Sequence, residues 1–295
     1  MRMTNNIMVN NLKRNISRNM YQMSKLDNML STGKRINKPS DDPTGIVDSL
    51  RLSSRLKETA QYQENVADAK SWLESTDSSL GSLNSVLNRI YELSVKSANG
   101  TLSHEDRATI NEEVTQLKNE VITIANASHG DRYLFGGKNT TKEPYLNGAW
   151  DPDLSNAELK YEIGVGITVP VNVTAEAVFQ VGTPQDLLGT IQQIIDHLDA
   201  DDTTSLGGTD LDNLKQNIDT VLSARSQIGA RVNRLEMSAD RLTELNINLT
   251  SLKEDVEGID PAKVILDMKN QENVYQAALA VGARIIQPTL VDFMR

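Results

Sequence analysis

The residue types that most often carry chemistry are few in this sequence, and they are scattered. Three histidines, His104, His129 and His197, lie far apart, and none stands at metal-ligand spacing from a carboxylate. The chain has no cysteine, which excludes disulfides, thiol catalysis and cysteine–zinc sites. It contains no nucleophile elbow, zinc-protease motif or complete phosphate loop. The sequence therefore predicts no catalytic residue, no metal site and no cofactor, and an enzyme is the function class it favours least.

Two acidic segments remain as candidates for metal or acid–base chemistry. Asp41 and Asp42 are adjacent, but no third ligand lies nearby, and an aspartate just before Pro43 is well placed to cap the next helix. Residues 199–210 have the length and the first two acids of a calcium loop. Thr204 stands where that loop needs glycine, and an aspartate replaces its final glutamate. We therefore expect helix capping in the first segment and an acidic loop in the second.

Charge and hydropathy exclude further classes of partner. The net charge of -10 and the pI near 4.9 argue against nucleic acid, because phosphate binding needs a basic face. Residues 1–38 hold eight Lys and Arg and one acid, a net +7, so the remaining chain carries -17. A basic N-terminus also occurs in organellar transit peptides, but this one is rich in Asn and Met and its pattern continues without a break. No apolar run reaches membrane length, and the N-terminus lacks a secretory signal core. We expect no membrane partner.

The longest predicted element is a helix over residues 211–256. Stepping alternately by three and four residues from Leu211 gives fourteen positions, of which eleven are apolar. Such a period keeps one seam of a helix facing a partner. At about 1.5 Å per residue this helix would be roughly 70 Å long, which suits a rod and not a compact domain. A second seamed helix is predicted over residues 44–99. The candidate seam residues are Leu73, Leu80, Leu83, Leu87, Ile90, Leu214, Ile218, Val221, Ile228, Val232, Leu235 and Leu242.

The other helices are shorter. A third begins at a capping-box pattern over residues 103–106 and forms a hairpin with the second. An N-terminal helix with a narrow apolar stripe ends at Gly33, a natural C-terminal cap. Its many asparagines make it marginal alone, so it is either a frayed terminus or a segment that folds on assembly. The last helix follows Asp260, which is placed to cap it. Between the first two helices, an extended charged connector ends with Ser40, Asp41, Asp42 and Pro43.

Residues 137–183 differ in composition and in hydropathy pattern from the parts of the chain that are predicted to be helical. Glycine and proline gather around this segment, residues 159–163 and 167–173 alternate apolar with polar residues, and Asn147-Gly148 is a hairpin-type turn. These features predict a small β insert. A helix is then expected to restart with Thr183 as its cap.

Several motifs together resemble a known family. Residues 30–37 (LSTGKRIN), followed by residues 40–43 (SDDP), are similar to a signature shared by bacterial flagellins and flagellar hook–filament junction proteins. Asn99-Gly100-Thr101 with Asp106-Arg107 fits both groups. The junction proteins are favoured by Pro39 and Pro43, Asn126 with Gly130, and the segments at residues 133–137 (YLFGG), 228–236 (IGARVNRLE), 275–280 (YQAALA) and 287–293 (QPTLVDF). The resemblance covers both ends and most of the helical middle, but little of the β insert.

The resemblance implies a mainly α fold: an elongated, flagellin-like coiled-coil bundle with a small β insert and paired terminal helices. The domains would be residues 1–40 with 259–295 for assembly, 41–136 with 184–258 for the bundle, and 137–183 for the outward insert. The subunit-assembly interface would comprise Met8, Leu12, Ile16, Met23, Leu26, Leu30, Ile265, Met268, Tyr275, Leu279, Gly282, Ile286 and Leu290.

The resemblance also implies a function and its partners. The protein would be a non-enzymatic adaptor, exported to the extracellular flagellum without a cleaved signal peptide. Its expected partners are copies of itself in a ring, the first hook–filament junction protein, flagellin, and a cytoplasmic export chaperone at the C-terminal helix. A flagellin-type filament subunit is the nearest alternative. A coiled-coil secreted effector or interaction protein is a more distant one.

Overall fold

The computed structural model describes residues 5–99, 102–152, 154, 157–184 and 186–285. The chain divides into two compact units. The first, the terminal unit, combines the residues up to Glu58 with those from Leu245 onward, and the second, the bundle unit, spans Thr59–Glu244. The three-part division made from the sequence stays a prediction.

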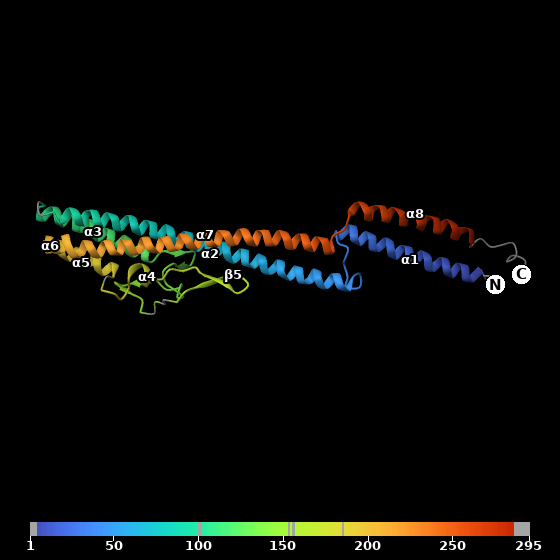
Figure 1. Ribbon diagram of the computed structural model, residues 1–295, viewed down its shortest axis with the longest axis horizontal. Coiled ribbons are helices and arrows are strands. Elements are labelled where there is room, and N and C mark those ends of the chain that lie inside the picture. The colour runs from blue at the N-terminus through green and yellow to red at the C-terminus, as the bar shows by residue number, and fades with distance from the viewer. Residues whose placement is uncertain (1–4, 100–101, 153, 155–156, 185, 286–295) are drawn as a thin grey trace, which may run out of the picture. The chain divides into compact units, whose positions relative to one another are not determined.

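The predicted mainly helical fold with a small β insert is confirmed (Figure 1). No helix among the described residues is long and apolar enough to cross a membrane. The helical elements are α1 (Asn5–Thr32), α2 (Pro43–Ser97), α3 (His104–Ala125), α4 (Ala175–Phe179), α5 (Leu187–Asp199), the single turn α6 (Thr203–Ser205), the π-helix η1 (Leu206–Asp210), α7 (Leu211–Glu257) and α8 (Pro261–Ile285).

Four helices supply the core of the bundle unit, namely α3, α5 and the parts of α2 and α7 that belong to it. Their apolar stripes meet because leucine and isoleucine recur at three- and four-residue spacing on each helix. The predicted capping box opens α3: the Ser103 hydroxyl accepts from the Asp106 N–H, and the Asp106 carboxylate accepts from the Ser103 N–H. The helix therefore begins where the sequence indicates.

The strands of the described residues form three antiparallel hairpins, of which the first precedes the predicted insert and the other two lie within it. Their strands are β1 (Ser128–His129) with β2 (Arg132–Tyr133), β3 (Tyr145–Leu146) with β4 (Ala149–Trp150), and β5 (Lys160–Gly164) with β6 (Ile167–Pro170). Asn147 and Gly148 form the turn of the second hairpin with φ of 53° and 84°, as the Asn-Gly pair predicts. The inner side of the insert is buried on the bundle core through Phe135, Val169 and Phe179.

Two predicted boundaries between the insert and α7 are wrong. The helix α5 begins at Leu187, capped by Asp186, and not at Thr183. The Thr183 carbonyl instead accepts from the Asp186 N–H in a turn, while the Asp186 carboxylate accepts from the Gly189 N–H at 3.0 Å. The segment that was expected to be an acidic loop is largely helical, because α6 and η1 lead directly into α7.

In the terminal unit, α1 and α8 pack side by side and run antiparallel (Figure 1). The Gln271 side-chain amide of α8 donates to the Asn19 side chain of α1 at 3.0 Å. Gly282 is buried, and a Cβ at this position would lie 2.6 Å from Leu12 Cδ2. Gly282 therefore allows the close approach of the two helices near the chain ends.

Candidate assembly site

A group of polar contacts in the terminal unit joins the connector after α1 to the residues between α7 and α8. Gly33, with φ of 68°, ends α1, and the connector then turns onto the end of α7. The Arg35 N–H donates to the Glu257 carbonyl at 2.6 Å, and Lys34 forms an antiparallel bridge with Gly258. Ile36, the next residue of the connector, is buried. The connector is thus bonded to a segment more than two hundred residues away. We call these residues, with Ser49, Asp41 and Asp42, the joint.

Glu257 is the central side chain of the joint. It is buried, and its carboxylate accepts from the Ser49 hydroxyl and pairs with Lys34 Nζ at 2.8 Å. Burial acts to raise the pKa of Glu257, but the hydrogen bonds from Lys34 and Ser49, with the charges of Lys34 and Lys253, outweigh it, so the pKa is lowered. The carboxylate therefore stays ionised in a buried place because its partners compensate for lost water.

The two adjacent aspartates have separate structural tasks. Asp42 accepts from the N–H groups of Thr44 at 3.2 Å and Gly45 at 2.9 Å, so it caps α2. Asp41 accepts from the N–H of Lys38 at 3.0 Å and pairs with Lys25 Nζ at 3.2 Å. Backbone N–H donors are the main cause that lowers the pKa of each carboxyl. Pro43 opens α2, and Ser40 is exposed.

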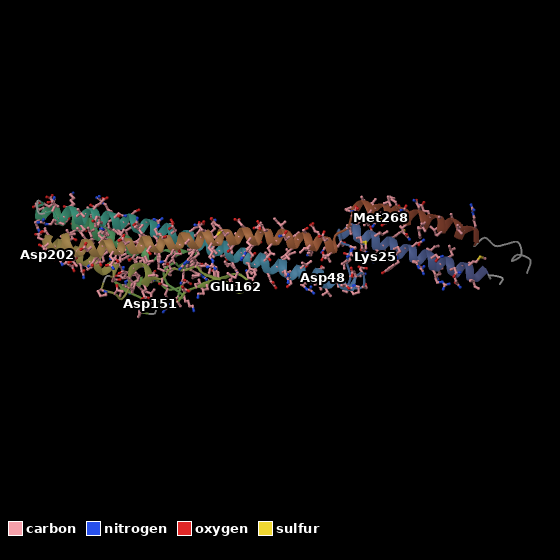
Figure 2. The ribbon with its side chains drawn as sticks, in the orientation of Figure 1. Lys25, Asp48, Asp151, Glu162, Asp202 and Met268 are labelled. Atoms are coloured by element: carbon pink, nitrogen blue, oxygen red, sulfur yellow. The ribbon has the colours of Figure 1, made fainter. Side chains whose placement is uncertain are left out.

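The predicted assembly residues divide into two sets in the structure. Leu12, Ile16, Met23, Leu26 and Leu30 are partly buried on α1, as are Met268 and Tyr275 on α8, and Gly282 is buried. Met8, Ile265 and Leu279 are 36%, 47% and 45% exposed. Figure 2 places Met268 on α8 and Lys25 on α1. Ile286 and Leu290 lie outside the described residues. The role of all these residues in subunit assembly stays a prediction.

The structure also shows exposed apolar residues of the terminal unit that are not among the predicted assembly residues. Exposed on α1 and α8 are Ile7, Met20, Tyr21, Leu266, Val274 and Val281. Near the joint, Val47 and Leu50 on α2 and Leu252 on α7 are also exposed. The inner positions of α8 also include Val264, which is buried, and Gln271. Because α8 carries apolar residues on more than one face, its sequence does not separate the inner positions from the exposed ones.

The predicted seam residues lie in or against the core of the bundle unit. Leu73, Leu80, Leu83, Leu87, Ile90, Leu214, Val221, Ile228, Leu235 and Leu242 are buried, while Ile218 and Val232 are partly buried and packed against the core. Arg225, a polar position in this seam, forms a two-point ion pair with Asp77, Nε to Oδ1 at 3.0 Å and Nη2 to Oδ2 at 3.2 Å. We expect this pair to favour one register of α7 against α2.

In residues 199–210, the segment that resembles a calcium loop, aspartate carboxylates contact other side chains of the protein. Asp201, in a left-handed conformation with φ of 56°, accepts from Arg107 Nε at 2.6 Å and contacts His104 Nδ1 at 2.8 Å. Asp210 is buried and lies 2.6 Å from His197 Nδ1. Within the described ranges, no group of three or more His, Asp or Glu is placed to hold a metal ion. These contacts connect the segment to α3 and α5.

Comparisons with known proteins match this architecture at both ends of the chain. Residues 3–140 match the family model described as the bacterial flagellin N-terminal helical region, and residues 211–294 match the C-terminal helical region. A flagellar filament 30.7 kDa core protein of Treponema maltophilum is 29% identical over 261 residues, covering 86% of this chain and 85% of that protein. Flagellar hook-associated protein 3 of Escherichia coli (strain K12) is 24% identical over 300 residues, covering 94% and 95%.

A solved structure shares the fold. It is a Vibrio parahaemolyticus protein assigned as a flagellar hook-associated protein, with a TM-score of 0.69 and 24% identity. The match covers 74% of this chain and 100% of that one.

Proposed function

Because the chain belongs to the bacterial flagellin family, we propose that it is a structural adaptor at the hook–filament junction of the flagellum. Membership of this family identifies the chain as a flagellar structural protein. Its position at the hook–filament junction is the more specific part, and it is the part that we propose. In this role copies of the chain form a ring, and flagellin assembles on that ring. The ring would rest on the first hook–filament junction protein.

The observation that carries the junction assignment is the turn at residues 133–137. Its sequence is similar to the turn by which junction proteins enter their β domain, and the structure explains why these residue types are needed. Leu134 and Phe135 are fully buried in the core. A Cβ on Gly136 would lie 2.4 Å from the Asn139 carbonyl oxygen, and Gly137 has φ of 65°. Both glycines are therefore required by the turn.

The terminal unit supplies a surface for contacts between subunits. The helices α1 and α8 cover part of each other's apolar stripes, yet Ile7, Tyr21, Ile265 and Leu266 remain exposed. An exposed apolar surface on a long helix pair favours association with further helices. We place the contacts between neighbouring subunits on this surface. Export to the outside through the flagellar apparatus, with a chaperone holding α8 beforehand, belongs to the same proposal.

A filament subunit is the second candidate, and the match to a Treponema filament core protein favours it. Adding the purified chain to isolated hooks that carry the first junction protein separates the two roles. An adaptor should add a short terminal layer and then permit flagellin to polymerise. Continued growth of long filaments from this chain alone would contradict the junction role and support the filament role.

A strain that lacks the gene gives the complementary measurement. An adaptor is required for flagellin to stay attached, so we expect loss of swimming together with flagellin monomer released into the medium. Normal motility of the deletion strain would contradict any essential flagellar role and would favour the secreted-effector alternative.

A further inference from the structure

A groove runs between α2 and α7 within the bundle unit. Two hollows that follow one another along the helices form it, with volumes of about 510 Å³ and about 570 Å³. Ala67 and Ala239 line the first hollow, and Ser78, Gly229 and Val232 line the second. On α2 the lining extends over residues 63–78, which is roughly 22 Å of helix. The groove is therefore long enough to receive about four turns of another helix.

Gly229 is a position in this groove that a single copy of the chain does not explain. It lies inside α7 and is exposed, and a Cβ there would meet no described atom within 4 Å beyond the neighbouring backbone of its own helix. A glycine inside a helix lowers the stability of that helix. It also belongs to the segment at residues 228–236 that resembles the junction proteins, and the joint does not involve this segment. A glycine in such a place indicates the close approach of a second helix.

The charge of the groove favours a basic occupant. Four acidic residues and one basic residue line the two hollows. The basic residue, Lys70, pairs with Glu236 at 2.7 Å and lies 3.8 Å from Glu74, while Asp77 pairs with an arginine of α7. Glu74 and Asp240 are exposed. The groove therefore keeps an excess of negative charge that is accessible from outside.

The outer face of α1 has the opposite charge and a matching length. Ile7, Arg14, Arg18 and Tyr21 recur at spacings of seven, four and three residues, so they share one face of the helix. All four are exposed, although other positions of α1 pack on α8. The helix contains four basic residues and one acid, Asp27. From the first to the last of the four exposed residues, the face is roughly 21 Å long.

We propose that the groove between α2 and α7 receives α1 of a second copy of this chain. The guanidinium groups of Arg14 and Arg18 pair with Glu74 and Asp240, and the helix backbone approaches α7 at Gly229. This inference rests on the proposed assembly of copies, and it adds the surface that receives the exposed face of α1. It applies to a junction ring and to a filament alike.

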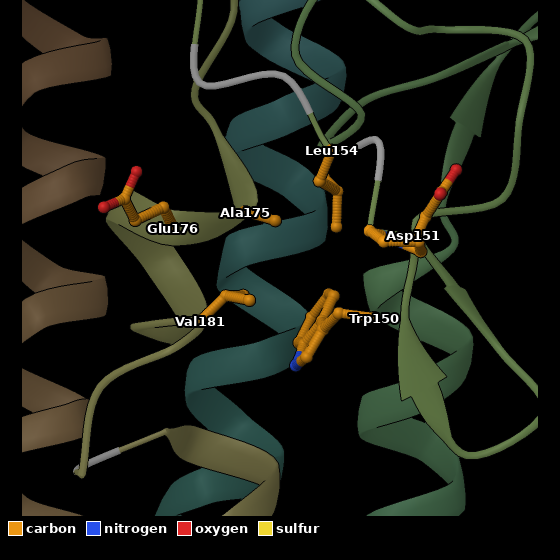
Figure 3. A pocket seen from close by; sticks show the side chains of 7 residues that line it. Trp150, Asp151, Leu154, Ala175, Glu176 and Val181 are labelled. Atoms are coloured by element: carbon orange, nitrogen blue, oxygen red, sulfur yellow. The ribbon is translucent and has the colours of Figure 1, made fainter.

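The hollow beside Trp150 in the β insert lacks these features. Its volume is about 330 Å³, and the Asp151 and Glu176 side chains at its rim point away from the tryptophan ring (Figure 3). Glu176 is exposed and lies outside the groove between α2 and α7. It therefore provides a control position for a change of charge.

Sedimentation of the full-length chain at low ionic strength tests the contact at Gly229. Gly229→Leu fills the groove and should weaken self-association about five- to one-hundred-fold, the range expected for overpacking. Its melting temperature should not fall, because leucine favours a helix more than glycine does and the position is open in a single copy. Ala230→Leu changes an exposed neighbour that does not line the groove, so this matched control should associate like the parental chain.

An exchange of charges tests the pairing of the two surfaces. Arg14→Glu with Arg18→Glu should weaken self-association at least about three-fold, because two attractions become repulsions. Adding Glu74→Arg and Asp240→Arg to the same chain should restore it. Adding Glu176→Arg instead should not. Unchanged helical circular dichroism verifies that each variant is folded.

The outcomes separate this contact from the junction role. Parental association of the Gly229→Leu chain, a failure of the groove exchange to restore association, or a parental chain that stays monomeric would each overturn the inference. Addition of copies to isolated hooks reports the junction role separately. Long filaments grown by the parental chain alone would contradict that role and would leave the contact between α1 and the groove in place.

Discussion

Glu257 connects three parts of the sequence at once, and single residues of this kind determine how the connector is held. Its carboxylate joins Lys34 of the connector and Ser49 of α2, and its carbonyl accepts from the Arg35 N–H. Because Ser49 is also buried, removal of Glu257 would leave this hydroxyl without its acceptor in a poorly solvated place, and the exposed Lys34 would lose its ion pair. The joint should therefore be sensitive to this one side chain, although neighbouring exposed acids carry the same charge.

Replacing Glu257 by alanine should release the connector. We expect a local loss of roughly 1–3 kcal/mol, the usual cost of removing one partner of a buried, charged hydrogen bond. Limited trypsin digestion measures this loss, because Lys34 and Arg35 lie in the connector and become cleavable when it opens. Glu254→Ala, one turn earlier and exposed, is the matched control and should be cleaved at the parental rate. Equal rates for the two variants would show that Glu257 does not hold the joint.

The joint should also open in acid, and the direction follows from its carboxyl groups. The pKa values of Asp41, Asp42 and Glu257 are all lowered in the folded chain. Their contribution to stability is therefore complete above the unfolded pKa values, near about 4, and is lost as the pH falls through the lowered folded values. The protection of residues 34–38 against hydrogen exchange, expressed relative to the intrinsic rate at each pH, should fall only in that acidic window. A loss of protection between about pH 8 and pH 6 would contradict this assignment.

At the level of elements, two glycines inside the long helices differ in whether the structure has space for a larger side chain. Around Gly229 in α7, no described atom other than the neighbouring backbone of the same helix lies within 4 Å of the place that a Cβ would take, whereas a Cβ on Gly282 in α8 would face Leu12 Cδ2 at 2.6 Å. Gly229→Ala should stabilise the bundle unit by about 0.5–1 kcal/mol, because alanine costs less backbone entropy in a helix. Gly282→Ala should loosen the α1–α8 pair by about 1 kcal/mol through overpacking.

Thermal unfolding measures the first change, and hydrogen exchange of α1 measures the second. A lower melting temperature for Gly229→Ala would mean that the surface of α7 is more constrained than the isolated chain shows. Unchanged exchange in Gly282→Ala would mean that Leu12 moves aside without cost.

The elements also show what the sequence could and could not predict. The seam from Leu73 to Ile90 and from Leu214 to Leu242 follows from a local period, so its burial was predictable. The contact of Lys34 and Arg35 with Glu257 was not, because no local pattern links residues so far apart. The inner face of α8 was only partly predictable. Apolar residues surround this helix, and the structure turns Val264 inward while Ile265 and Leu279 stay exposed.

At the level of the whole molecule, the two units differ in how far their folding depends on the helices at the chain ends. The bundle unit contains its own core, formed by residues between Val66 and Leu242. The terminal unit depends on α1 and α8 packing together and on the joint. Folding of the bundle and assembly of subunits should therefore be separable by truncation. This separation follows from where the buried apolar residues lie, and it holds for either the junction or the filament role.

Removing the residues before Ser40 and after Asp260 should leave a folded, soluble chain that does not assemble. The bundle unit keeps its core, so we expect the helical circular dichroism of α2, α3, α5 and α7 and one cooperative unfolding transition. The α2 and α7 ends near Glu257 should exchange amide hydrogens faster than in the full chain, because Lys34 and Arg35 are missing. Sedimentation should show a monomer where the full chain associates. An unfolded product would contradict a self-sufficient bundle, and an assembling one would contradict the placement of subunit contacts on the terminal unit.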